Sequence, residues 1–150
     1  MKKYFYLIVL LLFSCAVKAQ SAEDSVKAVI NKMFAAMKNA DSKSFRECFT
    51  DSAIFQSVIE KEGKVSVGTE SFKEFLEFID TQKKGDMDEQ ITFDVVRTEG
   101  PLGTAWTPYN FYYQQKFSHC GADSYQLVRI NGEWKIQYLI DTRSKTRCKQ

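Results

Sequence analysis

The sequence predicts an α+β domain in which three helices of the N-terminal half pack on one face of a curved antiparallel sheet. Apolar residues recur with helical spacing in three segments before residue 80. The stretch Thr104–Arg143 instead gathers β-branched and aromatic residues, and is typical of three consecutive antiparallel strands. A turn near Gln114-Gln115 and the Asn131-Gly132 dipeptide, a strong hairpin signal, join these strands.

The first nineteen residues have the composition of a secretory signal peptide. Lys2 and Lys3 precede the apolar run Tyr4–Phe13, and small residues lead to Ala19. We expect residues 1–19 to be removed and residues 20–150 to form a single domain, exported to the periplasm or secreted. Cleavage before Cys15, with acylation of that cysteine to a lipid anchor, is the alternative, although Phe13 is bulky for such a signal.

Charge and motifs exclude several function classes. The leader carries three lysines and no acid, so the formal net charge changes from +2 for the whole chain to −1 for the remainder. Without a basic face, we expect no binding to nucleic acid or to an anionic membrane. The chain has a single histidine and no HExxH, CxxC, Walker or dinucleotide-binding motif, so we expect neither a metal nor a cofactor.

Each helix has a start signal and an apolar face. Ser21 caps the first, whose apolar residues run from Val26 to Met37, and Asp41 or Ser42 caps a short second one. Ser71 and Glu74 form a capping box before the third, which carries Phe72, Phe75, Leu76 and Ile79.

Three further strands precede Thr104. Segments 53–58 and 64–67 alternate in polarity around Glu62-Gly63 and predict a hairpin. After a polar linker over residues 83–88, Ile91, Phe93 and Val95 predict one strand.

Hairpin geometry then predicts which side chains share the inner face. A two-residue turn at Asn131-Gly132 pairs Asp123 with Ile140 and Tyr125 with Tyr138, and the turn at Gln114-Gln115 pairs Asp123 with Trp106 and His119 with Asn110. The outer face would then carry Ser124, Gln126, Lys135, Gln137, Asp141, Arg143 and Cys120. Pro108 and Gly121 are plausible bulge sites, and a slip of one residue would turn the inner set outward.

Cysteine usage predicts one disulfide. Export leaves Cys48, Cys120 and Cys148 in an oxidising compartment, which gives one bridge and one free thiol. Cys48 lies on an apolar helical face, so we expect it to be buried and Cys120 to pair with Cys148. A turn at residues 144–146 would bring their Cα atoms within the necessary distance of about 7 Å.

Polar and aromatic residues on the inner face predict a small-molecule site. Trp106, Asn110, Tyr125 and Tyr138 are the expected ligand contacts. His119 and Asp123 are candidates for proton transfer, although a purely structural histidine–aspartate pair would give the same pattern.

Four segments, VINKMFAAMKNAD, SFRECFTDSAIF, SFKEFLEFI and GEWKIQYL, resemble the nuclear transport factor 2-like superfamily, which includes ketosteroid isomerases, scytalone dehydratases and SnoaL-like cyclases. WTPYNFY, FSHCGADSYQLVR and the late cysteine are similar to an uncharacterised branch. The resemblance implies a cone-shaped fold, a curved sheet closed by three helices around a pocket. It places Met33 and Ser57 where the isomerases have their oxyanion-stabilising tyrosine and their general-base aspartate, so steroid isomerisation by that mechanism is not expected here. Asp123 matches the aspartate that the isomerases keep protonated so that it can donate a hydrogen bond. Ketosteroid isomerase is itself the standard example of an aspartate kept neutral by an apolar site.

Three functions remain open from the sequence. The first is binding of a small apolar molecule in the pocket. The second is a cofactor-independent lyase or isomerase that uses His119 and Asp123. The third is a dimeric interaction module that uses the outer sheet face, including Lys135 and Gln137.

Overall fold

A computed structural model describes residues 21–148 and has the predicted α+β architecture, with three helices and a strongly curved sheet in this part of the chain. The predicted signal peptide and Cys15 lie outside the described residues. No helix within residues 21–148 is long and apolar enough to cross a membrane.

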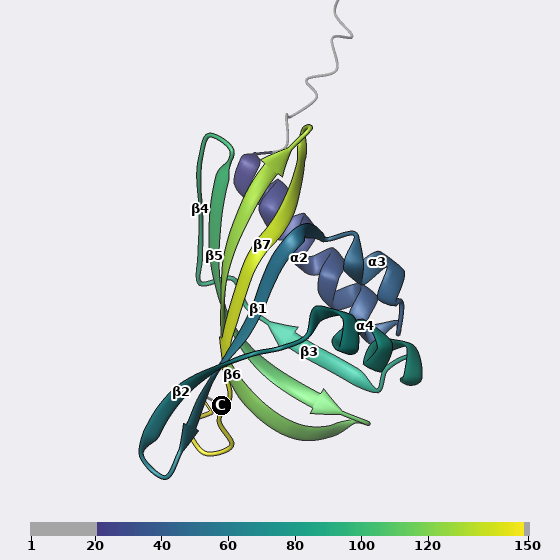
Figure 1. Cartoon of the computed structure of the whole chain (residues 1–150), viewed down its shortest axis with the longest axis vertical. Helices are drawn as coiled ribbons and strands as arrows, with labels where there is room; N and C mark the ends of the chain where they lie inside the picture. The colour runs from purple at the N-terminus through teal and green to yellow at the C-terminus, as the bar shows by residue number, and fades with distance from the viewer. Residues whose placement is uncertain (1–20, 149–150) are drawn as a thin grey trace, which may run out of the picture.

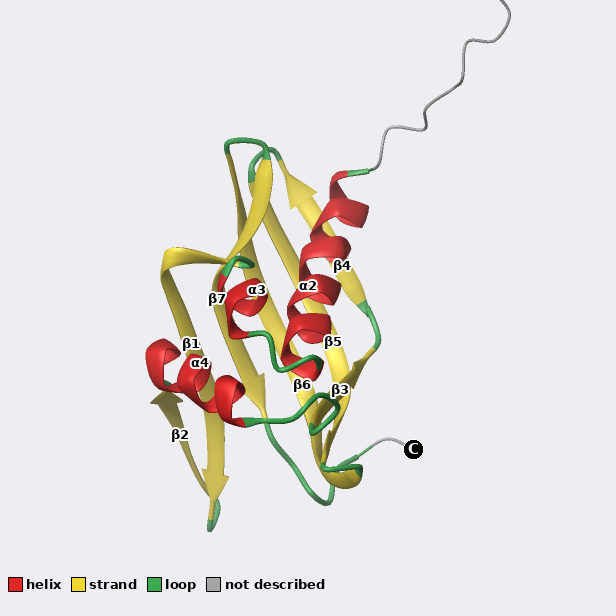
Figure 2. Ribbon diagram, turned by 90° about the vertical axis from the view of Figure 1, so that its right-hand side faces the viewer, coloured by secondary structure: helices red, strands yellow, loops and turns green. Residues whose placement is uncertain are grey.

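The helices begin where the sequence places their caps. Helix α2 spans Ala22–Lys38, and its Ser21 side chain accepts a hydrogen bond from the backbone N–H of Asp24. Asp41 caps the short helix α3, Ser42–Arg46, and Ser71 caps α4, Phe72–Thr81. Figure 2 shows all three on one face of the sheet.

The described strands form one seven-stranded sheet in the order β2-β1-β7-β6-β5-β3, with β4 also paired to β5. Their bounds are β1 Phe49–Lys61, β2 Lys64–Thr69, β3 Met87–Ile91, β4 Val95–Glu99, β5 Leu102–Tyr113, β6 Lys116–Ile130 and β7 Glu133–Thr142. In Figure 1 the long strands bend beneath the helices, which makes the helix-covered face concave.

The sheet is mixed, so the prediction of a wholly antiparallel sheet is wrong in one place. Strand β1 pairs with β7 in parallel, whereas the other described pairs are antiparallel. No short turn joins β1 to β7, so the local turn geometry that forces antiparallel pairing in a hairpin does not act on them.

The single strand predicted around Phe93 is two strands, β3 and β4, which both pair with β5. The interruption lies opposite Thr107-Pro108. Pro108 has no backbone N–H to give to a ladder, although its carbonyl accepts a hydrogen bond from the N–H of Thr92.

Two bulges change the predicted register. The β5–β6 register shifts beyond Phe111. Phe111 pairs with His119 and Tyr112 pairs with Phe117, so Ser118 is a bulged residue without a partner on β5. The β6–β7 register shifts at Gln137, between the pairs Leu127–Ile136 and Gln126–Tyr138. Neither bulge lies at Pro108 or Gly121. Because side chains alternate between the faces, each extra residue reverses which partners point inward.

The core lies between the helices and the concave face of the sheet. Its fully buried members include Val26, Ile30 and Met33 from α2, Phe45 from α3, and Tyr125, Leu127 and Ile136 from the sheet. Met33 and Phe45 of this core also border a cavity.

Candidate functional site

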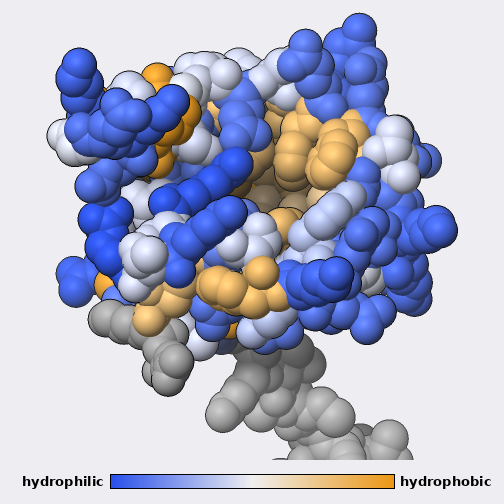
Figure 3. Space-filling model, turned by 90° about the horizontal axis from the view of Figure 1, so that it is seen from below, coloured by the Kyte–Doolittle hydropathy of each residue, from blue (hydrophilic) through white to orange (hydrophobic). Residues whose placement is uncertain are grey.

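A cavity of about 180 Å³ opens between the helices and the lower half of the sheet. Figure 3 looks at the molecule from below and shows a hollow with apolar walls inside a hydrophilic rim. The cavity has an apolar wall and a polar end, and each is built from different elements.

Phenylalanine and methionine side chains make most of the apolar wall. Helix α2 contributes Met33, Phe34 and Met37, and the other apolar lining residues are Phe45, Phe55, Phe75, Phe78, Met87, Phe111 and Leu139. Met33 therefore faces the cavity at the position where the isomerase resemblance expects a tyrosine, and a thioether cannot donate the corresponding hydrogen bond.

Asp123 lies at the polar end on β6, with 3% of its surface exposed. One of its carboxyl oxygens, Oδ2, accepts hydrogen bonds from the hydroxyls of Thr107 and Tyr125, each at 2.9 Å. Burial raises the pKa of Asp123 because the charged form loses its hydration, while the two hydroxyl hydrogen bonds act in the opposite direction. The result is a buried acid that exchanges a proton more readily than an exposed aspartate does near neutral pH.

Glu89 on β3 meets Asp123 across the concavity. The residue is half-buried and lines the cavity. Burial, the negative charges of Asp123 and Asp141, and a hydrogen bond with Asp123 together raise the pKa of Glu89 well above its ordinary value. The two carboxyl groups together therefore retain a proton to a higher pH than exposed carboxyl groups do.

Asp141 and Arg143 form the neighbouring side of the polar end. Arg143 donates from Nε to Oδ2 of Asp141 at 2.8 Å and from Nη2 to Glu70 at 2.7 Å. Glu70 also accepts from the Ser57 hydroxyl, so Ser57, the position of the isomerases' general base, supports this ion pair and is not among the cavity-lining residues. The single arginine of the lining thus bridges two of its acids.

His119 lies on the cavity wall between aromatic rings. Its ring packs against Tyr109 and Phe111, with centroids 5.7 and 5.1 Å away, and Nδ1 shares a hydrogen bond with the Ser118 hydroxyl at 3.0 Å. Burial and the positive charge of Arg143 lower the pKa of His119. The imidazole is therefore neutral at pH 7 and is able to accept a proton.

Among the six predicted site residues, the structure brings only His119 and Asp123 to the cavity lining. Tyr125 is fully buried behind the lining, where its hydroxyl binds Asp123. Trp106, Asn110 and Tyr138 are not lining residues, because the bulges at Ser118 and Gln137 pair them with Ser124, Cys120 and Gln126, which alternate away from Asp123. The prediction that these three side chains share the inner face is wrong.

The bulge at Gln137 also brings to the cavity two residues that the sequence analysis placed on the outer face of the sheet. Asp141 pairs with Asp123, so Asp141 and Arg143 reach the cavity in place of Tyr138 and Ile140. Glu89 was not singled out from the sequence either. The alternation of Met87, Glu89 and Ile91 could have revealed it, because it puts the glutamate on the same strand face as two apolar residues.

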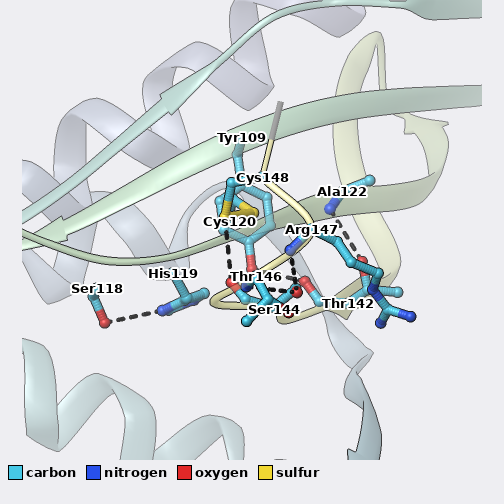
Figure 4. Close-up of a disulfide and its surroundings, with 10 residues drawn as sticks. All are labelled: Tyr109, Ser118, His119, Cys120, Ala122, Thr142, Ser144, Thr146, Arg147 and Cys148. Carbon is cyan, nitrogen blue, oxygen red and sulfur yellow. Dashed lines mark hydrogen bonds between the residues drawn. A yellow bond between two sulfur atoms is a disulfide. The ribbon is translucent and has the colours of Figure 1, made fainter. Parts of the chain in front are cut away.

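The predicted bridge between Cys120 and Cys148 is present, and the Cα atoms are 5.5 Å apart. Backbone hydrogen bonds between Cys120 and Ser144 dock the tail on β6 next to the bridge (Figure 4). Cys48 is a free, buried cysteine, and burial raises the pKa of its thiol to about 11. The tail that follows Arg143 is thereby tied to the strand that carries His119.

Solved structures share this fold at low sequence identity. An NTF2-like protein of unknown function from Shewanella baltica aligns with a TM-score of 0.61 and 16% identity over 81% of this chain and 93% of that one. An NTF2-like protein of unknown function from Silicibacter pomeroyi aligns with a TM-score of 0.63 and 14% identity over 80% of this chain and 93% of that one. A domain of unknown function with a cystatin-like fold, from Nostoc punctiforme, aligns with a TM-score of 0.62 and 22% identity over 86% of this chain and 82% of that one.

Sequence comparison identifies a family. No curated protein matches the sequence significantly. The model of the family described as "Putative lumazine-binding" matches residues 21–138, which is more than half of the chain. The chain therefore belongs to this family, which is one of the nuclear transport factor 2-like families.

Proposed function

We propose that the domain binds a small, flat and largely apolar molecule in the cavity between the helices and the sheet. The observation that carries this proposal is the cavity itself, about 180 Å³ with an aromatic wall and polar groups gathered at one end. A dry cavity of about 150 Å³ in another protein holds benzene, so this one suits a single ring, with room for substituents toward its opening.

The family description supports a ring ligand. Lumazine is a flat heterocycle whose ring faces suit an aromatic wall and whose edges carry hydrogen-bonding groups. The disulfide and the predicted leader support a role outside the cytosol, because disulfides persist in oxidising compartments.

A pair of leucine substitutions tests the binding proposal. Leu139→Trp puts an indole into the cavity from β7, whereas Leu102→Trp makes the same chemical change at an exposed position outside the lining. With lumazine and toluene as probes in a titration followed by NMR, Leu139→Trp should abolish binding and Leu102→Trp should leave it unchanged. Equal binding by both variants, or no binding by the unmodified protein, would contradict the proposal.

A cofactor-independent lyase or isomerase is the second candidate. It is favoured by neutral His119 and the proton-holding Glu89–Asp123 pair, which line the same cavity and provide a base and an acid without a metal. His119→Gln should then remove turnover of any identified substrate while its binding and the melting temperature stay nearly constant. A parallel loss of stability and activity would instead indicate a structural histidine.

Exposed apolar side chains on the outer sheet face favour self-association as a third candidate. Trp106 and Val95 are partners on β5 and β4, and about two-fifths of each is exposed. By contrast Gln137 and Lys135 hydrogen-bond within the chain, to Thr50 and to the Glu47 carbonyl. If this face mediates a dimer, Trp106→Ser should shift sedimentation from dimer to monomer, and a monomeric unmodified protein would exclude it.

A further inference from the structure

Acidic side chains outnumber basic ones at the polar end of the cavity. The lining includes four carboxyl groups, those of Glu70, Glu89, Asp123 and Asp141, and the only cationic lining side chain within residues 21–148 is Arg143. Arg143 is already bonded to Glu70 and Asp141. No lysine or arginine of the lining is left to neutralise Glu89 and Asp123.

Hydrogen-bond donors are in short supply there as well. Asp123 is satisfied by the neutral hydroxyls of Thr107 and Tyr125, and Glu89 by another carboxyl group. The second oxygen of Asp141, Oδ1, is buried and has no hydrogen-bond partner among residues 21–148. A buried acceptor without a donor is uncommon in folded proteins, so acceptors outnumber donors at this end of the cavity, and the one guanidinium of its lining is already bonded to Glu70 and Asp141.

We propose that the ligand is an aromatic molecule carrying a protonated nitrogen group, an amine or an amidine, which it places against Glu89 and Asp123. This inference rests on the proposed function, since it assigns the chemical class of the ligand that the cavity would hold. The nitrogen group gives Glu89 and Asp123 the N–H donors and the positive charge that Arg143, bonded to Glu70 and Asp141, does not give them, and the ring lies against Phe75, Phe78 and Phe111.

The cation takes the place of a proton. Without a cation beside it, the Glu89–Asp123 pair retains a proton, because two adjacent buried carboxylates repel one another. The charged and titratable groups around Glu89 are Asp123, Asp141, Arg143, Tyr109, Tyr125 and His119, which pairs with the same β5 residue, Phe111, and is neutral at pH 7. Arg143 is the only cation among these, so a cationic ligand releases the proton and binds more tightly as the pH rises.

Matched phenyl compounds test the inference. Benzamidine, benzamide, benzoate and toluene share a ring and differ in charge and in N–H donors. In titrations of the unmodified protein at pH 7, benzamidine should bind about tenfold or more tighter than benzamide, and benzoate should bind most weakly. Between pH 5 and pH 8 the affinity for benzamidine should rise while that for toluene stays constant.

Glu89→Gln is the diagnostic variant, because the amide keeps the shape of the protonated acid but cannot become an anion. It should reduce the preference for benzamidine and the pH dependence, because only the Asp123 carboxyl then remains for the cation, and it should leave the affinity for toluene unchanged. Glu99→Gln is the control, since Glu99 is an exposed residue on β4 outside the lining. It should behave like the unmodified protein.

The outcomes separate the two proposals. If toluene binds and benzamidine has no advantage over benzamide, the nitrogen assignment is overturned and the binding function stands. If none of the four compounds binds, the proposed binding function is contradicted, and so is the assignment of a protonated nitrogen group to the ligand. The pH series on the unmodified protein tests the nitrogen assignment even if Glu89→Gln does not fold, because an affinity for benzamidine that stays constant with pH would overturn it.

Discussion

Asp123 and Asp141 are register partners on β6 and β7, so two carboxyl groups project side by side into one cavity. Like charges directly opposite one another on neighbouring strands repel. Arg143 compensates Asp141, and the hydroxyls of Thr107 and Tyr125 compensate Asp123 in part. The polar end therefore keeps an excess of acidic groups, which favours the binding of protons there.

Glu89→Gln should become more stable relative to the unmodified protein as the pH rises. Because the folded-state pKa of Glu89 is raised, the folded protein binds more protons than the unfolded chain above the ordinary pKa of about 4.3, and stability falls as the pH increases through that window. The glutamine has no proton to lose. Urea unfolding of both proteins between pH 5 and pH 8 measures the difference, and a constant difference would show that Glu89 is not buried in this way.

Arg143→Gln should raise the pKa of His119. Burial has the largest lowering effect on that pKa and the guanidinium charge the second largest, so removing the charge should raise the pKa while the effects of burial, Asp141 and Lys145 remain. NMR titration is simple because the chain contains a single histidine. Arg97→Gln on β4, at an exposed position outside the lining, is the matched control and should leave the pKa in place. The same value in all three proteins would mean that Arg143 does not reach the imidazole.

Replacing both Cys120 and Cys148 with serine should lower the free energy of unfolding by about 3 kcal/mol, as expected for a bridge of this sequence separation. Denaturant unfolding with and without reductant provides the check, because reduced unmodified protein should match the double variant. A variant as stable as the oxidised protein would show that the bridge does not constrain the chain.

Gly121→Ala should destabilise the protein by about 3 kcal/mol. A methyl group at this position would collide with the backbone carbonyl of Thr142, which also accepts a hydrogen bond from Tyr109. Thermal unfolding should show a marked fall for Gly121→Ala and little change for Ala122→Ser, its neighbour on the same strand. Equal melting temperatures would mean that the tail packs less closely than the structure indicates.

The sequence predicted the helices and the hairpins because their signals are local. Ser21, Asp41 and Ser71 cap helices as expected, and Asn131 and Gly132 both have the positive φ of the predicted tight turn. The parallel pairing of β1 with β7 joins segments far apart in the chain and leaves no such signal.

The site was harder to predict than the fold, because a shift of one residue in strand pairing exchanges the side chains of the inner and outer faces. Ser118 and Gln137 look like ordinary strand residues in the sequence, yet each is an extra, bulged residue in its strand. Each bulge therefore changes which residues of the neighbouring strand lie opposite the inward-facing residues of β6. His119 and Asp123 were placed correctly because both lie on β6 and share its alternation. Trp106, Asn110 and Tyr138 were misplaced because they lie on the partner strands.

The most direct test of the central claim, a ligand-binding cavity with an acidic end, is amide chemical-shift mapping of the labelled protein with benzamidine. Binding in the cavity predicts the largest changes on the strands that carry Glu89, His119, Asp123 and Asp141. Changes confined to the outer face around Trp106, or no changes at all, would contradict it.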